Sequence, residues 1–493
     1  MDLKCIFSLT ILVSQISLSS TQNVNVVIQG ATSIGETDDN FAGLLNLDLK
    51  KKGLINAIKA FNRLRIKVGG SLQDQVVYGV GGVKNCHNFM KNEDSLFGFS
   101  QGCLPMERWD ELNKIFNQTG VKVTFGLKAL LGRNRSQIEK GLWVSDWKSQ
   151  NARDFMKYTI SKGYKVDSYE FGNQLSGAGM GGSVEAEQYG KDIVVLKNLV
   201  KESHPDPKTQ PNVLGPSGYY DEKWFNSFLE VSGHDVVDGV THHIYNLRPG
   251  DDPNMITKIQ DPSYLNQVAQ TYKGVLNIVE LFSLNMYLDQ LGMASTYNHK
   301  VFCRQTLISG NYALLNTTTS IPNPDYYGAL LWHRLMGSTV LAVTQESNPN
   351  LRVYAHCAKK KPGISIIFIN LSKDSSFNVT LSNYEHQSHN SRSTDVAKPE
   401  FRGSKDREEY HLAALAGNIQ GQIVLLNDVP MVPTETFDIP TMKPKLVNAS
   451  TPISIAAHSI VYVTIRDFQA PACAEITSLL YLKCNTFKPC LNF

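Results

Sequence analysis

The sequence has 493 residues, of which 42% are hydrophobic, and its formal net charge at pH 7 is +3. A chain of this size can bury a large core and form more than one domain. The small net charge neither favours nor excludes an acidic ligand, because a local basic groove would not show in the total. No stretch is apolar for long enough to cross a membrane, so we expect no membrane-spanning helix.

The N-terminus has the pattern of a secretory signal peptide. Lys4 precedes an interrupted apolar run over residues 6–16, and small residues follow that run. We therefore expect residues 1–22 to be a signal peptide, with a disordered N-terminus as the alternative. The expected location is the extracellular matrix or cell wall, or else a lysosome or vacuole. Six Asn-x-Ser/Thr sequons support secretion: Asn117, Asn134, Asn316, Asn370, Asn378 and Asn448.

The cysteines fit an oxidising compartment better than a metal site. Eight are present, and Cys5 would leave with the signal peptide. Seven would remain, so at least one thiol is unpaired or pairs between chains. The chain has no Cys-x-x-Cys motif, so zinc is not expected, and we expect neither another metal nor a cofactor.

The first half of the chain alternates between strand and helix patterns. Strand patterns occupy residues 25–29, 64–68, 121–127, 164–171, 213–215 and 236–243. Helix patterns occupy residues 45–61, 109–116, 153–161 and 222–231, with a further one after Ser183. Residues 78–105 predict a long loop that Cys86 and Cys103 could close. This alternation favours a parallel sheet covered by helices, as in a (β/α)8 barrel.

Polar residues follow several of the predicted strands. Asp74 lies beyond residues 64–68, Asn173 and Gln174 follow residues 164–171, and His243 ends residues 236–243. In a (β/α)8 barrel, catalytic residues sit at the carboxyl ends of the strands. The sequence therefore places a candidate site there.

The pattern changes twice in the second half. Residues 264–293 are helical nearly throughout and contain no clear strand, whereas residues 301–308 form a strand and residues 326–337 a helix. Beyond residue 347, short β patterns predict a small antiparallel sandwich, with residues 386–409 as a surface loop. The expected division is a strand at 23–40 that joins the sandwich, a barrel at 41–345 and a β-sandwich domain at 346–493.

Several longer motifs carry a specific resemblance. They occupy residues 34–41, 69–74, 172–173, 287–293, 303–305, 310–315 and 352–357. Through them the chain resembles the plant heparanase-like proteins of glycoside hydrolase family 79, relatives of animal heparanase and plant β-glucuronidases. The resemblance implies a TIM-type (β/α)8 barrel with a β-sandwich. It also implies retaining hydrolysis of β-glucuronosyl linkages, which needs two carboxyl groups about 5–5.5 Å apart.

The resemblance also shows what this chain lacks. Gln174 occupies the family's acid/base position, where a Glu is expected. The family's nucleophile motif, at the end of the seventh strand, has no counterpart. Glu280 is the nearest carboxylate and is interpreted as a helix surface residue. A second gap follows Phe41. We therefore expect strands 1 and 7 to be missing or shortened, and the barrel to be incomplete or closed by substitute segments.

The resemblance suggests roles for the remaining residues. Asn173 would contact the sugar at the cleaved linkage, and the alternative is a strand-end Asn bonded to its own backbone. The other expected substrate-binding residues are Asp74, His243, Tyr245, Gly310 and Tyr312. Turn formation or packing is the alternative for each of these, although it does not account for the whole motif around Gly310 and Tyr312. Lys128 stands where the family usually has Asn. Cys357 and Cys473 match positions bridged in animal heparanase, which implies a disulfide.

Three functional interpretations follow. The first is a heparanase-like glycosidase by descent that acted on heparan-sulfate-like or arabinogalactan-type glycans, or on glucuronides, and is inactive in this form. The second is a non-catalytic glycan-binding protein. The third is a nonfunctional splice or gene-model isoform. For partners we expect a glucuronic-acid-containing glycan or a glucuronide, no nucleic acid and a monomer. Peripheral membrane or cell-wall association stays open.

Overall fold

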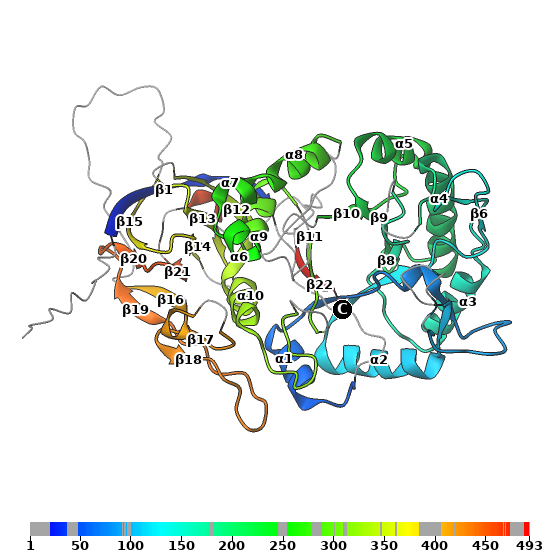
Figure 1. The fold of residues 1–493 in the computed structure, drawn as a ribbon, viewed down its shortest axis with the longest axis horizontal. Coiled ribbons are helices and arrows are strands. Elements are labelled where there is room, and N and C mark those ends of the chain that lie inside the picture. Colours follow the sequence, from blue (N-terminus) through cyan, green and yellow to red (C-terminus); the bar gives the residue numbers. More distant parts are fainter. Residues whose placement is uncertain are drawn as a thin grey trace, which may run out of the picture.

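The structure is a computed structural model of the chain. It describes residues 20–36, 48–90, 92, 95, 100–176, 182–244, 254–278, 288–299, 301–308, 313–345, 348–359, 362–383, 406–418, 421–466, 468, 470–473 and 488–492. Two large sheets organise these residues, a seven-stranded parallel sheet and an eleven-stranded, mainly antiparallel sheet (Figure 1).

The parallel sheet is the barrel, and its strand order is β10-β9-β8-β5-β2-β22-β11. Its strands are β2 (Arg65–Val68), β5 (Lys122–Leu127), β8 (Ser168–Phe171), β9 (Asn212–Tyr219), β10 (Gly239–His243), β11 (Val301–Gln305) and β22 (Lys488–Asn492). Every neighbouring pair is parallel. The expected barrel is thus present, with five strands in chain order and two that are not.

Amphipathic helices precede or connect these strands, namely α1 (Lys52–Ala60) before β2, and α2 (Met106–Thr119), α3 (Gln150–Ser161), α4 (Ala186–Ser203) and α5 (Glu222–Ser232) between strands. Helix α2 buries Trp109, Leu112 and Phe116, which lie three and four residues apart on one face. It ends at Gly120, whose φ of 68° is left-handed and suits glycine. The expected helix over residues 45–61 was too long, because α1 begins only at Lys52.

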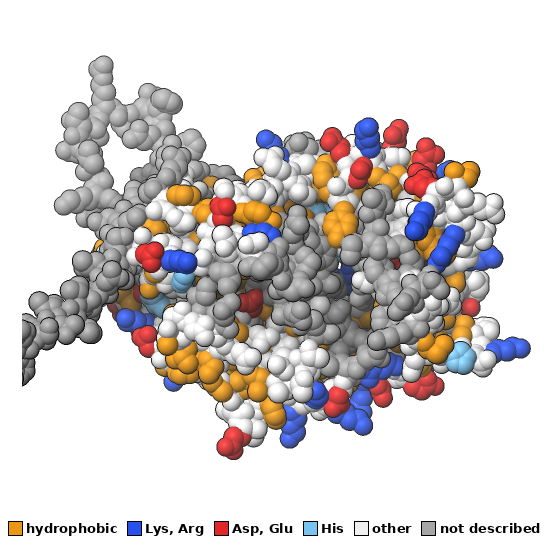
Figure 2. All heavy atoms as spheres, viewed as in Figure 1, with side chains coloured by type: hydrophobic (Ala, Val, Ile, Leu, Met, Phe, Trp, Pro, Cys, Tyr) orange, Lys and Arg blue, Asp and Glu red, His pale blue; other side chains and the backbone are white. Residues whose placement is uncertain are grey.

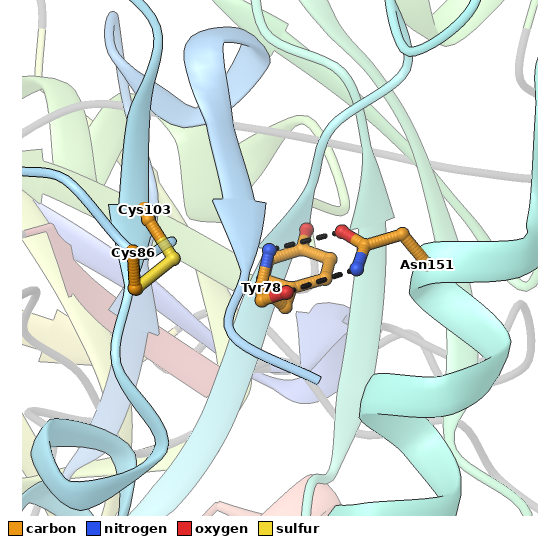
Figure 3. Close-up of a disulfide and its surroundings, with 4 residues drawn as sticks. All are labelled: Tyr78, Cys86, Cys103 and Asn151. Atoms are coloured by element: carbon orange, nitrogen blue, oxygen red, sulfur yellow. Dashed lines mark hydrogen bonds between the residues drawn. A yellow bond between two sulfur atoms is a disulfide. The ribbon is translucent and has the colours of Figure 1, made fainter. Parts of the chain in front are cut away.

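The long loop after β2 contains two short strands that the sequence did not predict. They are β3 (Val76–Tyr78) and β4 (Gly102–Leu104), which pair in parallel, and a Cys86–Cys103 disulfide closes the segment between them. Asn151 of α3 holds this loop against the barrel. Its side chain accepts from the Tyr78 amide and donates to the Tyr78 carbonyl, both at 2.9 Å (Figure 3).

A substitute segment completes part of the barrel. The C-terminal strand β22 lies between β2 and β11, where a first strand is expected, and it pairs in parallel with both. Figure 1 shows it beside β11 in the middle of the molecule. Its backbone register places Ile66 of β2 opposite Leu491, and Phe302 of β11 opposite Pro489. The expectation of a barrel closed by a substitute segment is confirmed at this position.

The barrel is open at the expected seventh strand. β10 and β11 are the two ends of the parallel sheet, and the elements described between them in the chain are all helices. These are α6 (Met255–Ile259), α7 (Pro262–Asn266), α8 (Val268–Ile278) and α9 (Leu288–Thr296). The described chain therefore has an incomplete barrel, with a seam between β10 and β11.

The second sheet has the order β18-β17-β16-β21-β14-β13-β12-β1-β15-β20, with β19 beside β16. Its strands are β1 (Ser20–Glu36), β12 (Met336–Thr344), β13 (Leu351–Ala358), β14 (Ile364–Asn370), β15 (Ser375–Asn383), β16 (Asp406–Ala414), β17 (Val424–Leu426), β18 (Val429–Pro430), β19 (Lys445–Asn448), β20 (Ile453–Ile455) and β21 (Ile460–Ile465). The N-terminal strand β1 joins it, antiparallel to β12 and parallel to β15. The loop expected at 386–409 was wrong at its end, because β16 begins at Asp406.

The two sheets share a continuous core through β14. Alternate residues of this strand, such as Ile366 and Phe368, pack in the core of the second sheet. Ile367 and Ile369, on the other face of the strand, belong to the barrel's core. Helix α10 (Pro324–Leu335) lies on this second face, and the Tyr462 hydroxyl of β21 donates to its Gly328 carbonyl at 2.9 Å. β14 is consequently buried along its whole length.

Helix length and surface charge are two further features of the described structure. Among the described residues, every helix is too short or too polar to cross a membrane. On the face shown in Figure 2, acidic and basic side chains are interspersed, as the small net charge suggests.

Candidate active site

The barrel strands bring the predicted polar residues to one edge. Asp74, Lys128 and His243 lie at or just beyond the carboxyl ends of β2, β5 and β10, and Asn173 and Gln174 follow β8. Because parallel strands all end on the same side of the barrel, these residues converge there. Asp74, Lys128, Asn173 and Gln174 are buried, and His243 is partly buried.

Gln174 and His243 form one hydrogen-bonded pair. Gln174 has a left-handed φ of 59°, and its backbone amide donates to the Ser217 carbonyl at 2.8 Å. Its side-chain nitrogen Nε2 lies 2.9 Å from His243 Nδ1. Because an amide nitrogen can only donate, His243 Nδ1 must accept and the ring proton must lie on Nε2. In this orientation of its amide, Gln174 donates to the imidazole of His243.

A second layer of polar side chains lies against this pair, inside the barrel. The Ser217 hydroxyl is 3.1 Å from His243 Nε2 and accepts from Lys67 Nζ at 2.9 Å. Lys67 also forms a buried ion pair with Glu170. Burial, with the charge of Lys67 and the neighbouring His242, lowers the pKa of His243 well below its usual value. This shift favours the neutral form of the imidazole.

Asp74 ties two strand ends together. Its carboxylate accepts from the Ala129 amide and from the Asn173 amide, both at 2.7 Å. Burial raises its pKa to about 6, although both hydrogen bonds oppose that rise. Each oxygen therefore holds one backbone amide, which gives Asp74 a structural role at these strand ends.

Asn173 has one atom left for a ligand. Its side-chain oxygen Oδ1 is buried and accepts no hydrogen bond in the described structure. A buried acceptor without a donor costs about 1–3 kcal/mol, which a ligand hydroxyl could recover. The contact between Asn173 and a sugar therefore stays a prediction, with Oδ1 as the atom that would accept the hydrogen bond. Tyr245, Gly310, Tyr312 and Glu280 lie outside the described residues.

Among the described residues the arrangement can bind polar groups, and its carboxyl groups, those of Glu170 and Asp74, are both engaged. Glu170 is paired with Lys67, and Asp74 is held by two amides. Retention requires one carboxyl group as acid/base and another as nucleophile. An amide at residue 174 supplies neither proton transfer nor a nucleophile. The described residues also contain no cluster of three potential metal ligands.

Sequence reasoning missed the inner residues Lys67, Glu170 and Ser217. A usable signal existed for the first two, because β2 and β8 are both predicted barrel strands and carry opposite charges. Ser217 gave no such signal, because the strand expected at 213–215 ends before it. The observed strand β9 continues to Tyr219.

A cavity of about 240 Å³ adjoins these strand ends. Asp74, Gln75, Ser95, Gln101, Lys128, Leu130, Leu131, Gly132, Arg133, Arg135 and Trp143 line it. Lys128 comes from the end of β5. Arg135 and Trp143 come from the paired short strands β6 (Asn134–Arg135) and β7 (Trp143–Val144), in which they are register partners.

Covalent features away from the strand ends agree only partly with the sequence. The Cys357–Cys473 disulfide is present and spans 116 residues. The sequons at Asn117, Asn134, Asn316, Asn378 and Asn448 are exposed or half-buried. Asn370 is the exception, because it is 3% exposed and its amide donates to the Ser375 and Ala456 carbonyls. The folded chain cannot carry a glycan at Asn370.

The fold defines an architecture, a TIM-type parallel barrel sheet joined to a mainly antiparallel sheet. A GH51 arabinofuranosidase from Xanthomonas axonopodis pv. citri has a similar structure, with a TM-score of 0.62 and 15% identity, over 90% of this chain and 99% of that chain. The α-L-arabinofuranosidase from Thermotoga maritima has a TM-score of 0.57 and 13% identity, over 90% of this chain and 100% of that chain. At such low identities these likenesses show the fold alone.

The family follows from sequence comparison. Residues 29–298 match the model of the glycosyl hydrolase family 79 N-terminal domain. "Heparanase-like protein 2" of Arabidopsis thaliana is 42% identical, over 92% of this chain and 96% of its own length. "Baicalin-beta-D-glucuronidase" of Scutellaria baicalensis is 34% identical, over 86% and 84% respectively. This chain belongs to glycosyl hydrolase family 79.

Proposed function

We propose that this chain is a family 79 protein that binds glucuronic-acid-containing glycans or glucuronides at the barrel's strand ends without hydrolysing them. Gln174 carries the proposal. It stands at the acid/base position that the family resemblance implies, and it donates its amide proton to His243. The family supports a glycosidase ancestry, and the names of two relatives mention heparanase and a β-glucuronidase.

The network around Gln174 depends on its being a donor. A glutamate at this position would accept, so His243 would have to carry its proton on Nδ1 instead of Nε2. The bond between His243 Nε2 and Ser217 would then reverse its direction. The observed arrangement around residue 174 is therefore compatible with an amide there.

The retained features are those needed for binding. Asn173 keeps an unused buried acceptor, and Asp74 still fixes the Asn173 backbone. Binding needs only complementary donors and acceptors, whereas turnover needs both carboxyl groups. Loss of the pair therefore removes hydrolysis and leaves a polar groove.

The decisive assay is turnover of an aryl β-glucuronide by the purified chain at acidic pH. We expect negligible hydrolysis from the natural chain and from Gln174→Glu, because general acid/base catalysis of about 10²–10⁴-fold cannot act without the nucleophile. Rescue should require Glu at 174 together with the missing strand-seven segment and its Glu. The "Baicalin-beta-D-glucuronidase" relative would show that the assay works.

Binding is measured separately, by calorimetry with a glucuronic-acid-containing oligosaccharide. Saturable binding without turnover supports the proposal. Turnover by the natural chain would contradict it and would direct attention to Glu280. Absence of binding by a folded chain would contradict the retained-groove part.

A further inference from the structure

Lys128 is the one cation of the cavity whose charged atom has no assigned partner in the described part of the chain. The residue is 7% exposed, and no hydrogen bond or ion pair of its Nζ is found there. Its backbone is engaged, because its amide donates to the Tyr78 hydroxyl and its carbonyl accepts from Trp147. An ammonium group that is buried without a partner is costly, so its retention calls for an explanation.

Asp74 does not satisfy this charge. The charge of Asp74 acts on Lys128, but no ion pair joins the two side chains among the described contacts. Burial lowers the pKa of Lys128 to about 8, and the charge of Asp74 only partly opposes that fall. The ammonium thus remains poorly compensated, although it is still mostly charged at neutral pH.

The two arginines that line the cavity differ in whether the guanidinium group is already paired with an acidic group. Arg133 is committed, because its Nε donates to the Ala129 carbonyl and its guanidinium pairs with Asp192 at 2.5 Å. Arg135 is exposed and lies over the Trp143 ring at 5.4 Å. Its guanidinium is therefore available for a second contact while the ring holds it in place.

We propose that this cavity is a subsite for an anionic substituent of a sugar, a carboxylate or a sulfate ester, which is held by Lys128 and assisted by Arg135. The inference rests on the proposed glycan-binding role and names the charge of the glycan. The cavity of about 240 Å³ is smaller than the roughly 300–1,000 Å³ of typical small-molecule sites. It would therefore take one charged substituent of a longer chain, not an extended segment.

The lysine distinguishes this chain from its family, whose usual residue after the strand is Asn by the resemblance noted above. An amide binds a hydroxyl or an anion without charge, whereas an ammonium supplies three donors and a full positive charge. Hydrogen bonds to charged groups are about twice as strong as neutral ones. The substitution would therefore shift preference from neutral towards acidic sugars.

The test measures calorimetric affinity of the full-length chain for three probes. These are a sulfated glucuronic-acid-containing oligosaccharide, the same backbone without sulfate, and the desulfated backbone with its carboxyl groups reduced to alcohols. The variants are Lys128→Asn and Lys128→Arg. Lys114→Asn, on the exposed face of α2, removes the same charge away from the cavity and serves as the matched control. Far-UV circular dichroism checks that each variant folds.

We expect Lys128→Asn to weaken binding of at least one charged probe by about 10- to 100-fold and to leave the reduced probe unchanged. Lys128→Arg and Lys114→Asn should stay within about threefold of the natural chain, since each keeps a charge in the cavity. Loss confined to the sulfated probe identifies a sulfate ester, and loss for both charged probes identifies the carboxylate. If folded Lys128→Asn binds every probe as the natural chain does, the subsite is wrong while the proposed function stands. If the natural chain binds no probe, both fail.

The pH dependence of the affinity gives a second readout, which would not change if Lys128 were merely structural. Affinity for the charged probe should fall as pH rises through about 8, where Lys128 loses its proton. The groups facing it do not titrate in that range, because the pKa of Asp74 is about 6, that of Tyr78 is raised above its usual value, and Arg133 and Arg135 stay charged. Lys128→Arg should abolish this fall. An unchanged profile in Lys128→Arg would overturn the inference.

Discussion

At the scale of single residues, Asp74 shows how a strand-end carboxylate can serve the fold. One oxygen takes the Ala129 amide after β5 and the other takes the Asn173 amide after β8. Asp74 thereby fixes the spacing of two strand ends on which the site depends. Its raised pKa of about 6 shows that the ionised form is kept at some electrostatic cost.

We predict that Asp74→Asn destabilises the protein by about 1–3 kcal/mol at pH 7.5, measured by urea denaturation. The Asn oxygen can accept one amide, but its NH2 group would face the other, which leaves a buried donor unsatisfied. Asp154→Asn, whose side chain is bonded only to exposed Gln150 among the described contacts, is the control and should change stability by less than about 0.5 kcal/mol. Equal stability of Asp74→Asn and the natural chain would show that the two amides find other acceptors.

His356 carries a prediction about acid. It is fully buried, donates from Nδ1 to the Gly337 carbonyl at 2.7 Å and faces Ser295 at 3.1 Å, and burial lowers its pKa to about 4. The pKa of His356 is lower in the folded chain than in the unfolded chain, where it is about 6.5. The neutral residue therefore makes its full contribution to stability above about pH 6.5. That contribution is lost progressively as pH falls from 6.5 towards 4.

The loss attributable to His356 should reach about 3 kcal/mol near pH 4, since each pKa unit corresponds to about 1.4 kcal/mol. His356→Gln cannot take up this proton, so its unfolding free energy should fall less steeply between pH 6.5 and 4. Parallel slopes for the two proteins in urea denaturation would contradict the assignment to His356.

At the scale of elements, the Cys357–Cys473 disulfide joins β13 to the segment after β21 across 116 residues. The chain-entropy model gives such a loop about 4–5 kcal/mol of stabilisation, against about 3 kcal/mol for the Cys86–Cys103 loop of 17 residues. Replacing the first pair by Ala should therefore lower stability more than replacing the second. Guanidinium denaturation of both double variants measures the difference, and a larger loss from the shorter loop would show that local packing outweighs loop length.

The sequence predicted those elements whose local pattern agrees with their final environment. The helix pattern at 109–116 became α2, because its apolar stripe meets the barrel. Prediction from the sequence failed where the pairing partners of a strand are distant in the chain. Residues 488–492 show no strand pattern, and Pro489 argues against a central strand, yet β2 and β11 recruit them as β22. Likewise, polar β16 looks like a loop until β21 pairs with it.

The same limit applied at the site. Strand-end positions are readable from the alternation of elements, so the sequence placed Asp74, Asn173, Gln174 and His243 at or beyond strand ends, where they lie. Hydrogen-bond partners are not readable, because they depend on neighbouring strands that are far apart in sequence. The link from Gln174 through His243 to Ser217 joins three strands, and only the fold reveals it.

At the scale of the whole molecule, each of the two sheets contains a strand from the opposite end of the chain. The N-terminal strand β1 belongs to the antiparallel sheet, and the C-terminal strand β22 belongs to the barrel (Figure 1). β14 and α10 add a continuous core between them. Neither sheet is complete without a segment from the opposite end, which favours unfolding as one unit.

We predict that a chain ending at residue 487 loses its cooperative thermal transition. Removing β22 exposes the facing edges of β2 and β11, in addition to the seam beside β10, and unpaired parallel edges favour aggregation. Light scattering and circular dichroism during heating measure both effects. Deletion of Phe493 alone is the control. A truncated chain that stays monomeric and melts like the natural one would show that β22 is dispensable.

The position of β22 also has a consequence for biosynthesis. β2 and β11 leave the ribosome long before the segment that joins them, since β11 ends at Gln305 and β22 begins at Lys488. At about 5–20 residues per second, the barrel waits roughly 10–40 s for its last strand. During that interval β2 and β11 lack the strand that lies between them, and their facing edges stay unpaired. A chain released before residue 488 would keep both edges exposed.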